Sequence, residues 1–241
     1  MNNKLTILYV DEYPLRKMGR LAGLCWKAPV DDPVKNERRG IECIKAGHWR
    51  VLEFVDVIME ISGISARLGR ELYTHIGGAP TRLQESTRYV DESGFKYYEP
   101  AKCADNPEYA KAMENIQKSY GTLLSAGVPR EDAANILPLG METRIVWKVN
   151  LRTLVNFMNK RLCTRALKEI RDFTGLLRKT LGELDSDWAF IARTLFVPSC
   201  EVYKWRNPAL CFCQETKCCG RHPKVEDIVV SGPGSETSGE G

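Results

Sequence analysis

The stretch that decides the expected fold reads Trp147-Lys148-Val149-Asn150-Leu151-Arg152-Thr153-Leu154-Val155-Asn156-Phe157. Apolar side chains recur there and beyond at three- and four-residue spacing, which is typical of one face of a helix: Leu151, Leu154, Val155, Met158 and Leu162. The pattern predicts one long helix over residues 147–184, interrupted at Gly175. Polar residues at i, i+4 and i+7 give this helix an expected polar edge, formed by Arg152, Asn156 and Asn159.

The rest of the chain shows shorter signals that together predict a mixed α+β fold. Residues 5–10 are apolar and β-branched, so a strand is expected there that leaves into a loop at Asp11. Residues 51–61 mix both periods, and a strand is favoured for their second half, ending near Gly63. Two glycines and a proline predict a loop over residues 74–82. Helical spacing predicts helices over residues 33–45, 66–73, 107–126 and 187–195, and a short one that begins at Pro129.

Composition limits the class of protein. The chain has 241 residues, 43% of them hydrophobic, which is enough for a substantial core. Its net charge of +4 is too small for a protein that coats nucleic acid and suits small anionic ligands better. No apolar run of about 18 residues exists, and the first residues lack a signal-peptide pattern. We therefore expect a cytoplasmic protein with neither a membrane nor a nucleic acid as partner.

The nine cysteines are expected to be reduced thiols. Their number is odd, and five lie between residues 200 and 219, unlike a disulfide framework spread through a secreted domain. Cys25, Cys43, Cys103 and Cys163 are interpreted as ordinary small apolar residues. The C-terminal group has enough ligands for a tetrahedral zinc ion, namely Cys200, Cys211, Cys213, Cys218, Cys219 and His222. Its spacing is not that of paired Cys-x-x-Cys knuckles, so a reduced appended segment is favoured over a structural metal, and no metal-binding residue is predicted.

Two segments have the chemistry of an anion site. The first, residues 74–89, combines a histidine, two glycines, two arginines and several hydroxyls, which suits a phosphate cradle, although a solvated polar loop has the same composition. In the second, Arg161 and Arg165 lie one helical turn apart beside the apolar stripe. They are expected to meet a ligand phosphate, or alternatively to reach solvent or pair with Glu169.

The order of these residues resembles the flavin-dependent thymidylate synthases. That family's hallmark is an Arg-His-Arg triplet, seven further residues, and a serine leading into an arginine and a tyrosine. The corresponding segment here runs from Thr74-His75 through Ser86-Thr87-Arg88-Tyr89, with Ile76-Gly77-Gly78 after the histidine. Three further blocks resemble the family in the right order, so that the likeness covers about residues 40–173: Gly47-His48 ahead of Glu53, residues 136–139, and residues 147–157.

The resemblance implies both a reaction and an assembly. The fold would be α+β, with a small sheet, long helices and active sites formed between the subunits of a homotetramer. The reaction would convert dUMP to dTMP, with methylenetetrahydrofolate as the one-carbon donor and FAD, reduced by NADPH, as the hydride source.

Residue by residue, the resemblance also implies a site. FAD would contact His48, Thr74, His75, Ile76, Asn150, Arg152, Asn156 and Arg165, and dUMP would contact Gln84, Ser86, Arg88 and Arg161. Arg161 and Ser86 are the candidate catalytic residues. Arg161 would favour anionic character in the uracil ring. The Ser86 hydroxyl is better suited to holding phosphate than to nucleophilic attack, because no base can be placed beside it from the sequence.

The chain departs from the family pattern at several positions. Thr74 replaces the first arginine of the triplet, and isoleucine or glycine replaces the third. Ala134 stands where many members have an arginine, so Asn135, Arg130 or Arg82 would have to compensate.

These departures keep two other functions open. The first alternative is a non-catalytic nucleotide- or RNA-binding protein, favoured by the basic balance, Tyr97-Tyr98 and the altered triplet. The second is a zinc-dependent interaction module built on the C-terminal cysteines. We expect a synthase domain over residues 1–198, a cysteine-rich segment over 199–230 and a flexible tail over 231–241.

Overall fold

An antiparallel sheet organises the molecule, which a computed structural model describes for residues 4–75 and 80–228. Within these residues the strands lie in the order β1-β2-β4-β3, and their bounds are Lys4–Val10 for β1, Asp56–Ser65 for β2, Thr81–Gln84 for β3 and Glu142–Asn150 for β4. Alternate residues of β2 and β4 are buried, so one face of the sheet meets the core. The other face has the cross-strand ion pairs Arg144–Glu60 and Lys148–Asp56, at 3.5 and 3.3 Å.

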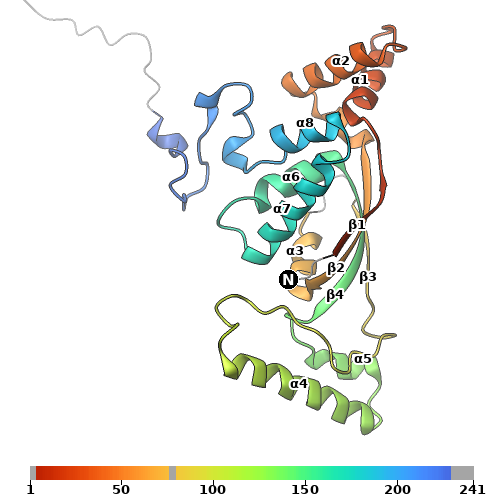
Figure 1. Ribbon diagram of the computed structural model, residues 1–241, viewed down its shortest axis with the longest axis vertical. Coiled ribbons are helices and arrows are strands. Elements are labelled where there is room, and N and C mark those ends of the chain that lie inside the picture. The colour runs from red at the N-terminus through yellow and green to blue at the C-terminus, as the bar shows by residue number, and fades with distance from the viewer. Residues whose placement is uncertain (1–3, 76–79, 229–241) are drawn as a thin grey trace, which may run out of the picture.

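Helices cover the apolar face of the sheet and extend beyond both of its ends (Figure 1). Against this face lie α3 (Ala66–Tyr73), α6 (Leu151–Arg161), α7 (Lys168–Gly182) and α8 (Ser186–Thr194). The pair α1 (Pro14–Cys25) and α2 (Pro33–Lys45) lies at one end, followed by the turn η1 (Trp49–Phe54). At the other end lie α4 (Pro107–Ser125), α5 (Arg130–Ala133) and the turn η2 (Ala134–Ile136). The mixed α+β fold is therefore confirmed.

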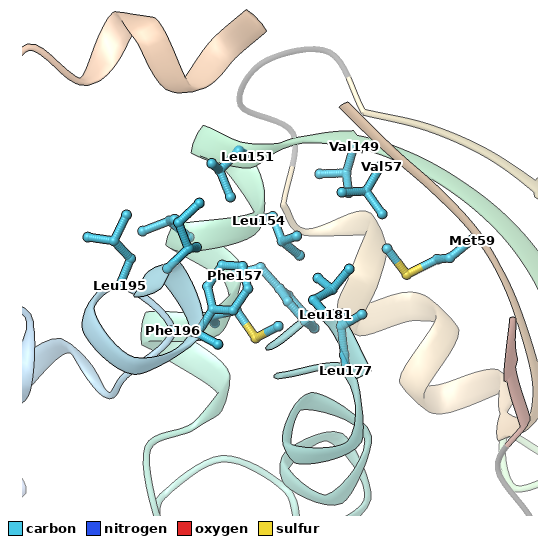
Figure 2. Packing of buried hydrophobic residues seen from close by; sticks show 14 of the residues in the cluster. Val57, Met59, Val149, Leu151, Leu154, Phe157, Leu177, Leu181, Leu195 and Phe196 are labelled. Atoms are coloured by element: carbon cyan, nitrogen blue, oxygen red, sulfur yellow. The ribbon is translucent and has the colours of Figure 1, made fainter. Parts of the chain in front are cut away.

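The core lies between the sheet and these helices. Figure 2 shows Val57, Met59 and Val149 of the sheet facing Phe157 of α6 and Leu177 of α7. Aromatic rings run through its centre: the Phe157 ring centroid lies 5.3 Å from that of Trp147 and 6.3 Å from that of Phe173. Because Phe157 also touches the candidate site described below, core packing and site geometry are coupled.

The prediction of one long helix over residues 147–184 is wrong in two places. Trp147–Asn150 belong to β4, whose buried alternate residues include Ile145, Trp147 and Val149. The Asn150 side chain then accepts a hydrogen bond from the Thr153 N–H at 2.9 Å, which caps α6 and marks the change from strand to helix. The real interruption lies between α6 and α7, and α7 runs unbroken through Gly175.

Other elements also differ from expectation. The loop expected after residue 10 is short, because Pro14 occupies the first turn of α1. Gly63 does not end β2; it has φ of 69° in a bulge between Ser62 and Ile64. Strand β3 begins inside the segment expected to be a loop. Asn159 is buried and donates to the carbonyls of Leu195 and Val197, so it is not part of a polar edge.

The C-terminal segment, residues 199–228, has little regular structure. It contains the turns η3 (Ser199–Glu201), η4 (Pro208–Leu210) and η5 (Val225–Asp227), and a bridge between Cys213 and Lys224. All nine cysteines lie in the described ranges and none forms a disulfide. Within those ranges no helix is long and apolar enough to cross a membrane. The expected tail over residues 231–241 lies outside the described residues.

The contact between α1 and α2 gives a testable prediction. A Cβ added at Gly40 would lie 2.2 Å from the carbonyl oxygen of Leu15, so the two backbones would have to separate. We expect Gly40→Ala to lower the free energy of unfolding by about 1–3 kcal/mol. The matched control is Gly121→Ala inside α4, where nothing lies within 4 Å of the new Cβ; it should raise stability by about 0.5–1 kcal/mol. Urea unfolding measures both, and equal effects at the two positions would contradict the close helix contact.

Candidate active site

The guanidinium of Arg161 joins the end of α6 to the end of α3. Its Nε donates to Nε2 of His75 at 3.1 Å, and one Nη donates to the Thr74 hydroxyl at 3.2 Å. The same side chain pairs with the Glu71 carboxylate at 2.7 Å. The structure therefore brings together Thr74, His75 and Arg161, three of the residues that the sequence assigns to the site. Glu71, which fixes the guanidinium, was not predicted.

The surroundings of His75 keep its imidazole neutral. Burial, followed by the positive charges of Arg161 and Arg82, lowers its pKa from 6.5 to about 4. A neutral ring can accept the hydrogen bond from Arg161, whereas an imidazolium cannot. The ring also meets Phe157 edge-on at a centroid distance of 5.0 Å. His75 is thus held between the aromatic core and a fixed cation.

Arg82, on β3, adds a second cation beside His75. Its guanidinium lies 4.3 Å from the ring centroid of Tyr73 and donates to the His75 carbonyl at 3.4 Å. Its Nε–H group is buried and has no hydrogen-bond partner in the described part of the chain. An unpaired buried donor is costly, so this atom is suited to an incoming acceptor. Among the residues named as compensation for Ala134, Arg82 is the one whose contacts place it at His75.

The predicted dUMP residues downstream lie on another part of the chain. Figure 1 shows β3 leading away from α6 toward α5. Gln84 ends β3 and donates to the Thr143 hydroxyl at 3.4 Å. The Ser86 hydroxyl accepts from the backbone N–H of Arg88 at 3.3 Å. Across the described ranges, no hydrogen bond or ion pair joins Gln84, Ser86 or Arg88 to Arg161.

Arg88 pairs with Glu131 of α5 at 2.7 Å, and its side chain remains 63% exposed. Arg130, another compensating candidate, lies nearby and donates to the Tyr89 carbonyl at 3.3 Å. Ala134 and Asn135 follow in η2. Two arginines therefore lie on this side of the molecule near Ser86, and each is paired with a carboxylate: Arg88 with Glu131 and Arg130 with Asp91.

A third group of predicted residues lies where η1 meets α6. His48 is exposed just before η1, and Arg152 in the first turn of α6 forms an ion pair with Glu53 of η1. Asn150 caps the helix, and Asn156 is exposed one turn further on. Ile76 lies outside the described residues.

Arg161 and Arg165 line one cavity of about 430 Å³. Arg165 follows α6 and pairs with Glu215 of the C-terminal segment at 3.5 Å. The alternative pairing with Glu169 is wrong: that carboxylate is buried and accepts from the backbone N–H and the hydroxyl of Ser65, at 2.7 and 2.6 Å. Burial raises the pKa of Glu169. Glu169 lies in the first turn of α7, and nothing in the sequence indicated its contact with Ser65.

The geometry thus gives a neutral histidine beside Arg161 and Arg82, with two further groups of paired cations elsewhere on the chain. Comparisons with known proteins identify the class of the chain. The family model described as thymidylate synthase complementing protein matches residues 11–184. The chain belongs to this family. The match ends before the cysteine-rich segment.

Curated relatives agree with this assignment. The chain is similar to the flavin-dependent thymidylate synthase of Saccharolobus solfataricus, with 36% identity over 60% of this chain and 56% of that protein. It is also similar to proteins with the same description from Sulfurisphaera tokodaii (36% identity, 54% of this chain, 51% of the relative) and Geobacter sulfurreducens (34% identity, 70% and 77%). The chain thus spans about half the length of the first two relatives.

The state of His75 gives a second testable prediction. The unfolded chain takes up a proton at His75 near pH 6.5, whereas the folded chain resists until about pH 4. This contribution to stability is complete above pH 6.5 and is lost as pH falls toward 4. We expect His75→Gln to reduce the drop in unfolding free energy between pH 7 and pH 5, measured with urea. His48→Gln, at an exposed histidine, should keep the wild-type drop. A His75 ring that titrates near pH 6.5 by NMR would show that it is not held neutral.

Proposed function

We propose that this chain is a flavin-dependent thymidylate synthase, which methylates dUMP reductively to dTMP. The observation that carries the proposal is the contact of Arg161 with both Thr74 and His75, at 3.2 and 3.1 Å, in a chain of this family. This contact joins residues 74–89, whose composition suits a phosphate cradle, to α6, whose sequence pattern suits a ligand-binding helix. The curated relatives with this description support the same reaction.

The donors around His75 fit a flavin nucleotide. An isoalloxazine ring needs apolar contact with a few donors at its edge, and its diphosphate needs cations. The Phe157–His75 contact and the Thr74 hydroxyl are of these kinds, and so is the buried Nε–H of Arg82, which has no partner among the described residues. We assign FAD to His48, Thr74, His75, Asn150, Arg152, Asn156 and Arg165, with Ile76 outside the described residues. Once reduced by NADPH, FAD supplies the hydride, and methylenetetrahydrofolate supplies the carbon.

We assign dUMP to Gln84, Ser86, Arg88 and Arg161. Arg161 keeps its orientation through Glu71, so its charge is preorganised to stabilise negative charge on the uracil ring. No histidine or lysine hydrogen-bonds to the Ser86 hydroxyl in the part of the chain that the structure covers. We therefore assign Ser86 to the phosphate and not to nucleophilic attack.

The proposed assembly is a homotetramer that acts in the cytoplasm. The positions of the dUMP residues support a site formed between subunits. Ser86 and Arg88 lie beside α5, whereas Arg161 lies at the end of α6 with partners of its own. A single ligand that contacts both groups is best accommodated if one subunit supplies Ser86 and Arg88 and a second subunit supplies Arg161.

The reaction is tested by tritium release from dUMP labelled at carbon 5. With FAD-loaded protein, methylenetetrahydrofolate and NADPH, we expect release that stops when NADPH is omitted. The visible absorption spectrum of the purified protein shows whether flavin is bound. Flavin-loaded protein that releases no tritium would end the proposal, and colourless protein that binds a nucleotide or RNA would favour the non-catalytic alternative.

The role of Arg161 is tested by Arg161→Lys. Lysine keeps the charge but cannot donate to His75 and Thr74 while it pairs with Glu71, because it lacks the planar fork of arginine. We expect kcat/KM for dUMP to fall by about 10²–10³-fold. The control Arg38→Lys makes the same exchange at an exposed position of α2 and should leave kcat/KM unchanged. Wild-type activity in Arg161→Lys would remove this residue from the mechanism.

A further inference from the structure

The C-terminal segment, residues 199–228, is held in place with almost no core of its own. Its only buried apolar side chains in the described ranges are Val202 and Cys211. Segments of this size that lack a core usually need disulfides or a metal ion to be stable, and no disulfide is present among the described residues. The family match ends at residue 184, so the proposed synthase chemistry does not account for this segment.

Three possible metal ligands meet inside this segment. One ligand atom each from Cys200, Glu201 and His222 lies within 4.8 Å of the other two. Glu201 Oε1 and His222 Nε2 are 3.2 Å apart, and their side chains are 17% and 18% exposed. Cys200 and Glu201 lie in η3, and the bridge between Cys213 and Lys224 brings the chain back beside them.

We infer that Cys200, Glu201 and His222 bind a zinc ion. Thiolate, carboxylate and imidazole are the ligands that zinc uses, at about 2.0–2.3 Å from the metal. Ligand atoms around a tetrahedral zinc are then roughly 3.3–3.8 Å apart. The Glu201–His222 pair at 3.2 Å is already close to this spacing, and the remaining ligand atoms, which lie within 4.8 Å, need only a small shift. Cobalt and other divalent metals share these ligands, but zinc suits a mixed sulfur, nitrogen and oxygen set.

We assign the fourth ligand to Cys213. Its N–H donates to the Pro223 carbonyl at 2.8 Å and its carbonyl accepts from Val225 at 3.0 Å, so its backbone is fixed one residue from His222 across the bridge. Cys213 also lines the same cavity as Cys200, although its thiol lies outside the group of three ligand atoms and has to turn toward the metal to complete it. Cys218 instead shapes the turn before His222, because its thiol donates to the His222 carbonyl at 3.4 Å and accepts from the Gly220 N–H at 3.3 Å.

This zinc would also fix one wall of the cavity of Arg161 and Arg165. Glu215, two residues beyond Cys213, pairs with Arg165 at 3.5 Å and with Lys160 at 3.9 Å. The rival explanation needs no metal: Glu201 pairs with Arg221 at 3.4 Å as well as with His222. The two explanations differ in zinc content, because only the first predicts stoichiometric zinc and sulfur ligands around it.

The test uses the full, FAD-loaded chain. After dialysis against zinc and then buffer, elemental analysis should find one zinc per chain. Zinc-edge X-ray absorption, which flavin does not disturb, should show two sulfur ligands at about 2.3 Å, together with nitrogen and oxygen. A wild-type chain without stoichiometric zinc would overturn the inference and would leave the proposed synthase function untouched.

Variants separate ligation from folding. Cys200→Ser and His222→Gln should weaken zinc binding by at least about 10–100-fold, and Cys213→Ser should lower the sulfur count to one. Cys219→Ser, at an exposed neighbouring thiol, should bind zinc like the wild type. His222→Cys should keep zinc and raise the sulfur count to three, which a merely misfolded segment cannot do. Unchanged affinity in Cys200→Ser and His222→Gln would also overturn the inference.

Discussion

The contact of Arg161 with His75 constrains the part of the candidate site around the histidine. It requires a neutral imidazole, because Nε2 must accept a hydrogen bond from a cation 3.1 Å away. Burial against Phe157 and the second cation, Arg82, provide that condition by lowering the pKa of His75 to about 4. Phe157 in turn packs on Trp147 of β4. The orientation of the site is thus set by the core and the sheet.

The sequence predicted a site near these residues but not how their charges are balanced. The helix spacing after residue 147 and the composition of residues 74–89 pointed to the two segments, and the family resemblance then selected Thr74, His75 and Arg161 within them. The partners Glu71, Glu53 and Glu131 were missed, because each lies on an element whose packing against the arginine is decided by the tertiary fold. Surface glutamates on helices have no sequence pattern that identifies such a role.

The errors in secondary structure have a related cause. The β4–α6 junction has apolar residues on both sides, so the helical period of residues 151–162 extended backward over a strand. The signal that would have separated the two elements is Asn150, a helix cap directly after the alternating Ile145, Trp147 and Val149. In contrast, α2, α3 and α4 were predicted well, because a cap or a proline marks where each begins.

The counter-ions give the arginines different roles within the proposed function. The Arg88–Glu131 pair is 63% and 52% exposed, and exposed pairs contribute only about 0–1 kcal/mol, so a phosphate can replace Glu131 at little cost. Arg161 is 22% exposed and held by three partners, so exchanging them for a mobile anion would leave Glu71 and His75 without their donor. Because its guanidinium is fixed in this way, Arg161 is suited to polarising the uracil ring of a bound dUMP. Within the proposed function we therefore assign the phosphate contact to the exposed Arg88 and the electrostatic contact to the half-buried Arg161.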